Sequence, residues 1–380
     1  MTTAFDTLGR KLRLGLLGGG PGSFIGPIHR AAALLDNRFE LVSGVLSSNA
    51  ARNAEGAASI GVTPRATLAE MIAQDRLDAV AIMTPNDRHF PECREALAGG
   101  LDVICDKPLT NSLAEARTLE QAAKGHVFCV THAYAGYPMI RQARAMVAAG
   151  VIGELRAIQV EYLQAGMSTP VEAGELTPKL RWKLAADRSG PSLVLGDIGT
   201  HAHHTACYVS GRVLVRLSAD LGAIVPGRKV DDYGAFLLRY QGGVRGTMTA
   251  SQALAGTEND ITLRVFGADG HIAWTHRENN HLVLALNGRP VQRLARGDVD
   301  LLPPAKRLIR IARGHPEGLT EAFANLYKDA AEAIAARITG VAADPLALDF
   351  PTAADGAAGL AFVEAALASR RGGGAWVDLK

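Results

Sequence analysis

Residues 12–29 read LRLGLLGGGPGSFIGPIH, and this stretch decides the fold of the first part of the chain. An apolar run leads into a glycine-rich turn, which is followed by the start of a helical pattern. Glycines at such a turn let the chain bend sharply and let backbone N–H groups approach a phosphate at the helix N-terminus. The pattern is irregular, because Ser23 stands where a third glycine is expected. A turn without a ligand is the alternative, but its place after a first strand favours a dinucleotide site. The predicted contacts are Gly18, Gly20, Gly22 and Ile25.

From this stretch to about residue 133, short apolar runs alternate with amphipathic segments. The predicted strands are 12–18, 39–46, 78–83, 101–105 and 126–132. The predicted helices between them are 27–35, 50–59, 68–74, 88–97 and 113–123. Strands that are apolar on both faces and separated by helices indicate a parallel sheet with crossover helices. We assign residues 1–133 to a first, cofactor-binding domain.

After residue 133 the pattern changes to runs of alternating polarity separated by turns. A helix is predicted over 138–149, a strand over 154–163, a polar segment over 164–190 and a helix over 192–209. Further strands are predicted over 213–221, 233–240, 243–253, 261–266, 271–275 and 281–286, with helices over 318–336 and 353–369. Gly242-Gly243 and Ala268-Asp269-Gly270 are typical of hairpin turns. Residues 134–380 are therefore predicted to form an α+β domain for substrate binding and oligomerisation, with a large, open, mainly antiparallel sheet. Its last helix is expected to pack back toward the first domain.

The composition is that of an ordinary soluble protein. The 380 residues are 48% hydrophobic and 21% charged, and the formal net charge is +2. This balance gives no basic field for nucleic acid. The N-terminus lacks the apolar run of a signal peptide, and no unbroken apolar stretch is long enough to predict a membrane span. The four cysteines, Cys93, Cys105, Cys129 and Cys207, lack metal or redox spacing and are predicted to be reduced thiols of a cytoplasmic protein.

The end of the second predicted strand bears on the choice of nicotinamide cofactor. In NAD-binding sites a carboxylate at this point usually binds the adenosine ribose. Here Ser47 and Ser48 follow the strand, and Arg52 lies shortly after them. Two hydroxyls and an arginine suit a 2′-phosphate, so NADP is slightly favoured over NAD. A solvent-exposed Arg52 is the alternative.

Two clusters carry side chains suited to proton transfer. Lys107 is predicted at the carboxyl end of a parallel strand, where such sheets bind ligands. There it stabilises a forming alkoxide or moves the hydroxyl proton. Asp197 and His201 are four residues apart in a predicted helix, so the carboxylate is expected to orient the imidazole as a base. A surface lysine and a structural Asp–His pair are the alternatives. Gly196 and Gly199 are costly in a helix, and we take them as room for a nicotinamide or a substrate ring.

Neighbouring histidines raise the alternative of a metal site. His204 shares a helix face with Asp197 and His201, whereas His203 points elsewhere. We predict no metal, because zinc sites usually combine His or Cys ligands with an ordered second shell.

With these residues in view, nearly the whole chain resembles the Gfo/Idh/MocA family. The first turn is similar in Gly18-x-Gly20 and Ile25-Gly26-x-x-His29, although 22–24 are extra residues. Three further motifs match: Thr84-Pro85-Asn86-x-x-His89, Asp106-Lys107-Pro108 with Asp in place of the family's Glu, and Asp197-x-x-x-His201. His204 stands where the family often has an acid.

The resemblance implies a Rossmann domain followed by a second domain with an open sheet. It implies hydride transfer between NAD or NADP and a hydroxyl or keto carbon of a sugar, glycoside or cyclitol. Lys107, Asp197 and His201 are then the catalytic residues. The implied cofactor contacts also include Thr84, Pro85, Asn86, His89, Asp106, Lys107, Pro108 and Trp182.

Closer likeness is to sugar dehydrogenase members, through Arg181-Trp182-Lys183, His315-Pro316-Glu317-Gly318 and Asp349-Phe350-Pro351-Thr352. The candidate substrate contacts, besides the catalytic residues, are Tyr134, Tyr137, Lys183 and His315. Two other functions stay open: redox-neutral cleavage of a glycoside through transient oxidation, and a cofactor-sensing regulator without chemistry. We expect a homo-oligomer, dimer or tetramer, because a broad sheet with one open, apolar face can pair with a second copy.

Overall fold

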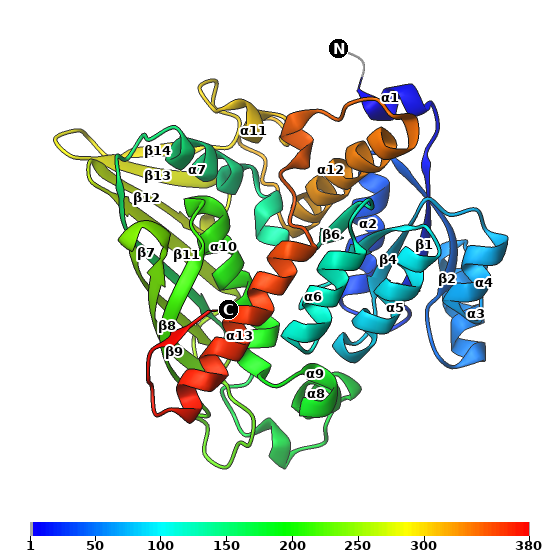
Figure 1. Ribbon diagram of the computed structural model, residues 1–380, viewed down its shortest axis with the longest axis horizontal. Helices are drawn as coiled ribbons and strands as arrows, with labels where there is room; N and C mark the ends of the chain where they lie inside the picture. Colours follow the sequence, from blue (N-terminus) through cyan, green and yellow to red (C-terminus); the bar gives the residue numbers. More distant parts are fainter. Residues whose placement is uncertain (1–2, 380) are drawn as a thin grey trace. The chain divides into compact units, whose positions relative to one another are not determined.

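The apolar runs of the first third of the chain form one parallel sheet in the computed structural model (Figure 1). The model describes residues 3–379, and all their side chains except those of residues 178, 179, 186 and 187. The strands are β1 (Leu12–Gly18), β2 (Phe39–Val45), β3 (Thr63–Pro64), β4 (Ala79–Met83), β5 (Asp102–Cys105) and β6 (Phe128–Val130), in the order β3-β2-β1-β4-β5-β6. Every side chain of β4 and β5 is buried, as expected for a sheet covered on both faces. The predicted parallel sheet is confirmed, and the short strand β3 was missed.

Helices connect these strands, and capping side chains set where several of them begin. They are α2 (Ile25–Leu35), α3 (Ala50–Ile60), α4 (Leu68–Gln74), α5 (Asn86–Ala98) and α6 (Leu113–Ala122). Asn49, Thr67 and Ser112 precede α3, α4 and α6, and the side chain of each accepts a hydrogen bond from the backbone N–H three residues on. Such caps satisfy backbone donors that the first helical turn leaves without partners. The five predicted helices are confirmed to within a few residues.

A segment from late in the chain completes this first unit. The compact unit contains residues up to 136 together with 318–357, and a second unit contains 137–317 and the residues from 358 onward. In the first unit α12 (Leu319–Thr339) packs on α2 and on α1 (Ala4–Leu8). Glu332 of α12 accepts hydrogen bonds from the backbone N–H groups of Ala4 (2.8 Å) and Phe5 (3.2 Å). The predicted division at residue 133 is therefore corrected, because it followed chain order and assigned 318–357 to the second domain.

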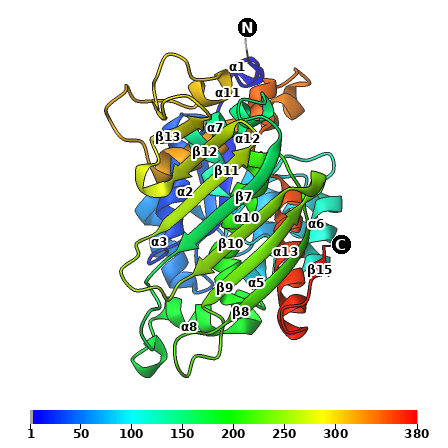
Figure 2. The same ribbon diagram turned by 90° about the vertical axis from the view of Figure 1, so that its left-hand side faces the viewer.

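The second unit is built on a nine-stranded sheet with the order β14-β13-β12-β11-β7-β10-β9-β8-β15. The strands are β7 (Leu155–Leu163), β8 (Leu214–Gly222), β9 (Tyr233–Tyr240), β10 (Arg245–Ser251), β11 (Asp260–Gly267), β12 (Gly270–Thr275), β13 (His281–Leu286), β14 (Gln292–Ala295) and β15 (Val377–Asp378). Neighbours are antiparallel except β7 and β10, which confirms the predicted mainly antiparallel sheet. Figure 2 shows α7 (Pro138–Ala148) and α10 (Thr200–Ser210) behind this sheet.

The outward face of this sheet is polar at its centre. In the middle of this face the exposed or half-exposed positions of β7, β10 and β11 are Gln159, Glu161, Thr247, Thr249, Thr262 and Arg264, whereas the half-exposed Ala157, Leu163 and Phe266 lie toward the strand ends. These positions pair across neighbouring strands, as in Gln159 with Thr247 and Arg264 with Gln159. The apolar partners of the same strands point to α10 and are buried. The expectation of an apolar open face is therefore wrong for the centre of the sheet.

The remaining elements are short, apart from the last helix. They are η1 (Ala133–Gly136), η2 (Val171–Ala173), α8 (Pro178–Leu184), α9 (Ala186–Ser189), η3 (Leu195–Gly199), η4 (Gln241–Gly243), η5 (His276–Glu278), α11 (Pro303–Lys306), η6 (Pro345–Leu348) and α13 (Ala353–Arg371). The stretch 345–371 is long and apolar enough to cross a membrane, but 61% of its most apolar window is buried, as in a core helix of a soluble protein. The four cysteines form no disulfide among the described residues, and Cys93, Cys105 and Cys129 are buried.

Candidate functional site

The glycine-rich turn after β1 approaches the ends of two neighbouring strands. Gly18 and Gly19 have φ of +74° and +68°, in the left-handed region that favours glycine. A Cβ on Gly18 would lie 2.7 Å from the carbonyl oxygen of Met83, and one on Gly20 would lie 2.3 Å from that of Leu46. The turn therefore presents backbone where a side chain would not fit, and it leads directly into α2. This is the arrangement that binds a pyrophosphate.

Gly26, rather than residue 23, takes the part of the third glycine. A Cβ on Gly26 would lie 2.1 Å from the carbonyl oxygen of Gly19, so the first turn of α2 packs tightly against the loop. The Ser23 hydroxyl accepts a hydrogen bond from the Gly26 N–H at 3.1 Å. The extra residues 22–24 thus lengthen the loop, and Ser23 stabilises the lengthened form. The sequence interpretation of Ser23 as a substituted glycine is corrected accordingly.

The residues after β2 form a helix cap. Asn49 accepts from the Arg52 N–H at 3.0 Å, and the Ser47 hydroxyl accepts from the Asn49 N–H at 3.2 Å. Ser48 and Arg52 are exposed. The buried Asn53, which the sequence analysis missed, accepts from the Leu46 N–H at 2.7 Å and so fixes the end of β2. No acid occupies the two positions after Leu46, as the sequence indicated.

The ends of β4 and β5 carry two of the predicted motifs. Thr84 donates to Glu92 at 2.5 Å, and Asn86 is buried at the start of α5. The Asp106 carboxylate accepts from the Lys107 N–H at 2.9 Å and from the Thr131 hydroxyl at 3.0 Å. The Lys107–Pro108 peptide bond is cis. Asp106 therefore holds the backbone of the turn that presents Lys107, which is half-buried.

His89 is buried between these two turns. Its ring nitrogens lie 2.9 Å from the carbonyl oxygens of Pro108 and Thr84. Both nitrogens are thus engaged with the main chain. The polar atoms of His89 bind the two turns, and a contact between His89 and the cofactor stays a prediction.

A second buried histidine of this unit, His29, is held by helix α12. Its Nδ1 lies 2.8 Å from the hydroxyl of Tyr327 in α12. Burial lowers the pKa of His29 to about 4, and although the Asp106 charge opposes this, the nearby His89 and Arg30 add to it. Burial likewise raises the pKa of the Tyr327 hydroxyl well above its ordinary value. His29 is therefore a neutral core residue at pH 7, packed against two aromatic rings.

In the second unit, Asp197 lies in a π-helical turn, which is wider than a turn of α-helix. Leu195–Gly199 forms a π-helical turn, which continues into α10 at Thr200. Such turns occur frequently at functional sites. The continuous α-helix predicted over 192–209 is therefore corrected. A Cβ on Gly199 would lie 2.7 Å from the Leu195 side chain, so this glycine accommodates the turn itself rather than a bound ring.

The Asp197 carboxylate is held by two donors that the sequence analysis did not assign to it. Its Oδ2 accepts hydrogen bonds from the Lys183 ammonium and from the Gln252 amide, the latter at 2.7 Å. Lys183, predicted as a substrate contact, thus neutralises the carboxylate. Charge-assisted bonds of this kind favour the ionised acid. Whether Asp197 also orients His201 stays a prediction.

Gln252 is the partner of Asp197 that the sequence analysis had no reason to select. It is buried directly after β10, and its amide nitrogen also donates to Gln164 at 3.1 Å. Because Nε2 serves two acceptors, the orientation of the amide is set. Gln164 begins the polar segment after β7, and nearby Tyr162 of β7 has its ring 6.1 Å from that of His201. A glutamine after a strand has no distinguishing pattern, so only the fold brings it to Asp197.

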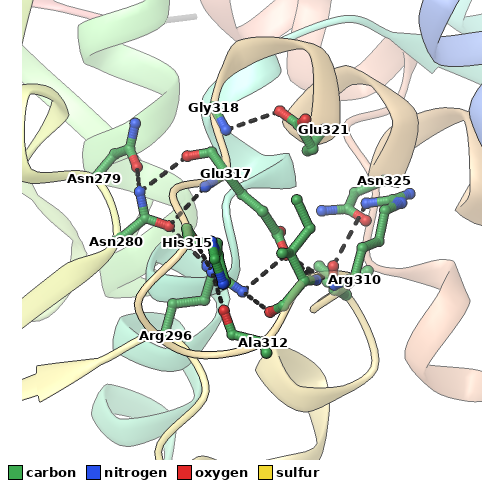
Figure 3. A network of polar contacts seen from close by, with 12 residues as sticks. Asn279, Asn280, Arg296, Arg310, Ala312, His315, Glu317, Gly318, Glu321 and Asn325 are labelled. Atoms are coloured by element: carbon green, nitrogen blue, oxygen red, sulfur yellow. Dashed lines mark hydrogen bonds and ion pairs between the residues drawn. The ribbon is translucent and has the colours of Figure 1, made fainter.

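The loop that carries His315 is anchored by a buried ion pair (Figure 3). Arg296 bonds Glu317 at 2.8 Å, and both side chains are 2% exposed. Arg296 also donates to Asn280 at 2.7 Å and to the His315 carbonyl oxygen. The backbone of the loop is therefore fixed, while the His315 side chain is exposed.

The remaining predicted residues differ in their surroundings. Tyr134 is buried in η1 of the first unit. Tyr137 is buried in the second unit, where its hydroxyl lies 3.0 Å from His276 Nε2, so it packs inside that unit. The Trp182 indole N–H in α8 is buried and has no acceptor among the described residues. No group of three metal-ligating side chains was found among the described residues, which include His203 and His204.

Comparison with known proteins decides the family. Residues 12–134 match a model of an oxidoreductase family with an NAD-binding Rossmann fold, and residues 140–273 match a GFO/IDH/MocA C-terminal domain. The chain belongs to the Gfo/Idh/MocA oxidoreductase family. The resemblance found in its motifs is thereby confirmed.

Three relatives of this Gfo/Idh/MocA protein cover most of both chains. The uncharacterized oxidoreductase YfiI of Bacillus subtilis is 31% identical over 386 residues, 98% of each chain. Levoglucosan dehydrogenase of Pseudarthrobacter phenanthrenivorans is 27% identical over 308 residues, 73% of this chain and 76% of the relative. An inositol dehydrogenase homologue from Azotobacter vinelandii, solved with NAD⁺, is 37% identical with a TM-score of 0.91 over 97% of each chain.

These findings make the protein an oxidoreductase with an NAD-binding Rossmann domain. The residues present fit the dinucleotide, because the turn at Gly18–Gly20 is a cradle that a Cβ would fill and α2 begins directly behind it. The preference for NADP drawn from Ser47, Ser48 and Arg52 is not confirmed, since the solved relative holds NAD⁺.

Proposed function

We propose that this protein is a dehydrogenase that oxidises one hydroxyl carbon of a sugar, glycoside or cyclitol, or reduces the matching keto carbon. The substrate class is supported by the names of the relatives, which include an inositol dehydrogenase homologue and a levoglucosan dehydrogenase. The observation that carries the proposal is the Asp197 carboxylate, held by Lys183 and Gln252 four residues before His201. A carboxylate fixed near an imidazole is a common device for general-base catalysis.

In this proposal His201 accepts the proton of the substrate hydroxyl, and Asp197 stabilises the imidazolium that forms. Lys107 supplies a positive charge to the oxygen as the C–O bond gains carbonyl character. When bound, NAD would supply the hydride acceptor for the carbon, so that the substrate would lose one C–H bond and one O–H bond together. Trp182 and His315 are proposed to line the nicotinamide and substrate ends, respectively. Asp106 keeps the Lys107 turn in place through its bond to the backbone N–H.

The test is a turnover screen with NAD and NADP against monosaccharides, glycosides and inositols, followed by absorbance of the reduced nicotinamide. Lys107→Ala and His201→Ala should each lower kcat about 10²–10⁴-fold while NADH still binds. Lys124→Ala and His271→Ala, away from the proposed residues, serve as matched controls and should keep full activity. Near-normal rates in both site variants with every active substrate would overturn the assignment.

The same experiment separates the two other functions that the motifs leave open. Stoichiometric formation of NADH alongside oxidised product supports the dehydrogenase. Release of free sugar from a glycoside without net NADH would instead indicate redox-neutral cleavage through transient oxidation. Absence of turnover with all substrates, despite NADH binding, would indicate a cofactor-sensing regulator.

We further propose a cytoplasmic homo-oligomer, a dimer or tetramer. Helices α7 and α10 cover one face of the second unit's sheet, and the other face mixes polar side chains with the half-exposed Leu237. Light scattering coupled to size exclusion tests this, and a single 40.0 kDa species would reject it.

A further inference from the structure

His89 is enclosed by the first unit with a hydrogen-bond acceptor at each ring nitrogen. Its Nδ1 lies 2.9 Å from the Pro108 carbonyl oxygen, and its Nε2 lies 2.9 Å from the Thr84 carbonyl oxygen. A carbonyl oxygen has lone pairs and no proton to donate. The residue is 1% exposed, so water cannot take the place of either partner.

These contacts restrict the protonation state of the ring. A neutral imidazole carries one N–H, so one of its nitrogens would direct a lone pair at a carbonyl lone pair. Turning the ring over would place carbon atoms at both oxygens and lose both hydrogen bonds. Only the imidazolium donates to both carbonyls at once.

We infer that His89 is a permanently charged imidazolium that ties the turn after β4 to the turn after β5 and thereby positions Lys107. It is a positioning residue, because it touches the main chain and not the reacting atoms. The inference concerns the first unit alone and does not depend on which substrate is oxidised.

The surroundings of His89 supply a counter-charge and a thiol that also hydrogen-bonds the ring, and the neighbouring Arg88 is paired with Glu92 at 3.3 Å. The Asp106 carboxylate interacts with it electrostatically, as do the Glu92 carboxyl of α5 and the Cys105 thiol of β5. Burial raises the pKa of Cys105 well above its ordinary value, so that thiol is neutral, and His29 of α2 is also neutral at pH 7. Burial by itself would lower the pKa of His89. With the thiol neutral, the Asp106 charge and the hydrogen bond to the Pro108 carbonyl are the interactions that oppose burial and raise the pKa of His89.

The connected turns contain the residues proposed to serve the reaction. One carries Thr84-Pro85-Asn86, and the other carries Asp106-Lys107-Pro108. The two ring N–H groups of His89 bind one carbonyl oxygen in each turn, so a single side chain fixes the backbone of both turns. Because the charge does not titrate near neutral pH, the connection is constant over the range in which an ordinary histidine switches.

The direct test is NMR of the full-length protein labelled with ¹⁵N-histidine, with His89 assigned by its loss in His89→Gln. Both ring nitrogens should show N–H character and stay unchanged from about pH 6 to about pH 9. A His89 ring with one bare nitrogen at pH 7 would overturn the inference.

A functional test compares His89→Gln with His126→Gln, a half-buried histidine beside Asp102 of the same unit. A glutamine at position 89 has a single amide NH₂ group, so it cannot donate to the Pro108 and Thr84 carbonyl oxygens from opposite sides as the imidazolium does. It should weaken NADH binding about tenfold or more and reduce kcat, whereas the control should bind as the parent does. Unchanged NADH affinity and kcat in a folded His89→Gln protein would contradict the positioning role.

Discussion

Replacing Gly26 with alanine probes the cradle that the first unit forms for the dinucleotide. The new Cβ would lie 2.1 Å from the Gly19 carbonyl oxygen, against 3.4 Å for ordinary contact. Loop and helix must therefore separate by about 1.3 Å, and overpacking of this kind costs about 1–3 kcal/mol. Both neighbours are backbone, so no side chain can turn away to relieve the contact. If the strain falls on the turn that receives the pyrophosphate, NADH affinity should drop about 10-fold to 100-fold.

The assay is NADH binding by fluorescence titration, with thermal unfolding measured on the same samples. Gly222→Ala is the matched control, because no atom lies within 4 Å of its added Cβ and its φ is not positive. The control should leave both NADH affinity and stability unchanged. An unaltered dissociation constant for Gly26→Ala, with an unaltered melting temperature, would refute the assignment of this turn as the cofactor cradle.

Three further changes test other parts of the site. Gln252→Leu should lower kcat about tenfold, because the Asp197 carboxylate loses one of the two donors that hold it. Arg296→Met should destabilise the protein by about 3–5 kcal/mol in denaturant unfolding, because it leaves a buried carboxylate without its cation. Unfolding free energy should also fall toward both extremes of pH. It falls below pH 6.5 as His29, with a native pKa of about 4, binds a proton only when unfolded. It falls again as pH rises above 6.5, because native His89, whose pKa is raised, keeps its proton and the unfolded residue loses it.

Helices and strands were predictable where apolar residues recur in the sequence with a clear periodicity. The strand prediction 12–18 coincides with β1, and 233–240 coincides with β9, because each run is apolar on the faces that become buried. The two-residue strands β3 and β15 were missed, since two residues cannot show a period. Both form at sheet edges, where pairing with the neighbouring strand determines their conformation.

The site was predictable to the extent that motifs are local in sequence. The turns at Gly18 and Lys107 lie next to the strands that position them, so the strand pattern located them. The partners of Asp197 come from positions 183 and 252, and their approach depends on the path of the whole second unit. The π-helical turn could not be predicted either. Gly196 and Gly199 indicate only that small side chains are needed there, and several kinds of structure require a small side chain.

The first unit cannot complete its fold until segment 318–357 has been synthesised. On the ribosome, the first 136 residues emerge without the helix whose Tyr327 covers His29 and whose Glu332 binds the N-terminal turn. The nucleotide-binding half therefore waits for nearly the entire polypeptide before it can reach its native state, which exposes the nascent chain to aggregation in the interval. A minimal version of that half should be built by splicing 318–357 onto residue 136 through a short linker, and not by truncation at 133.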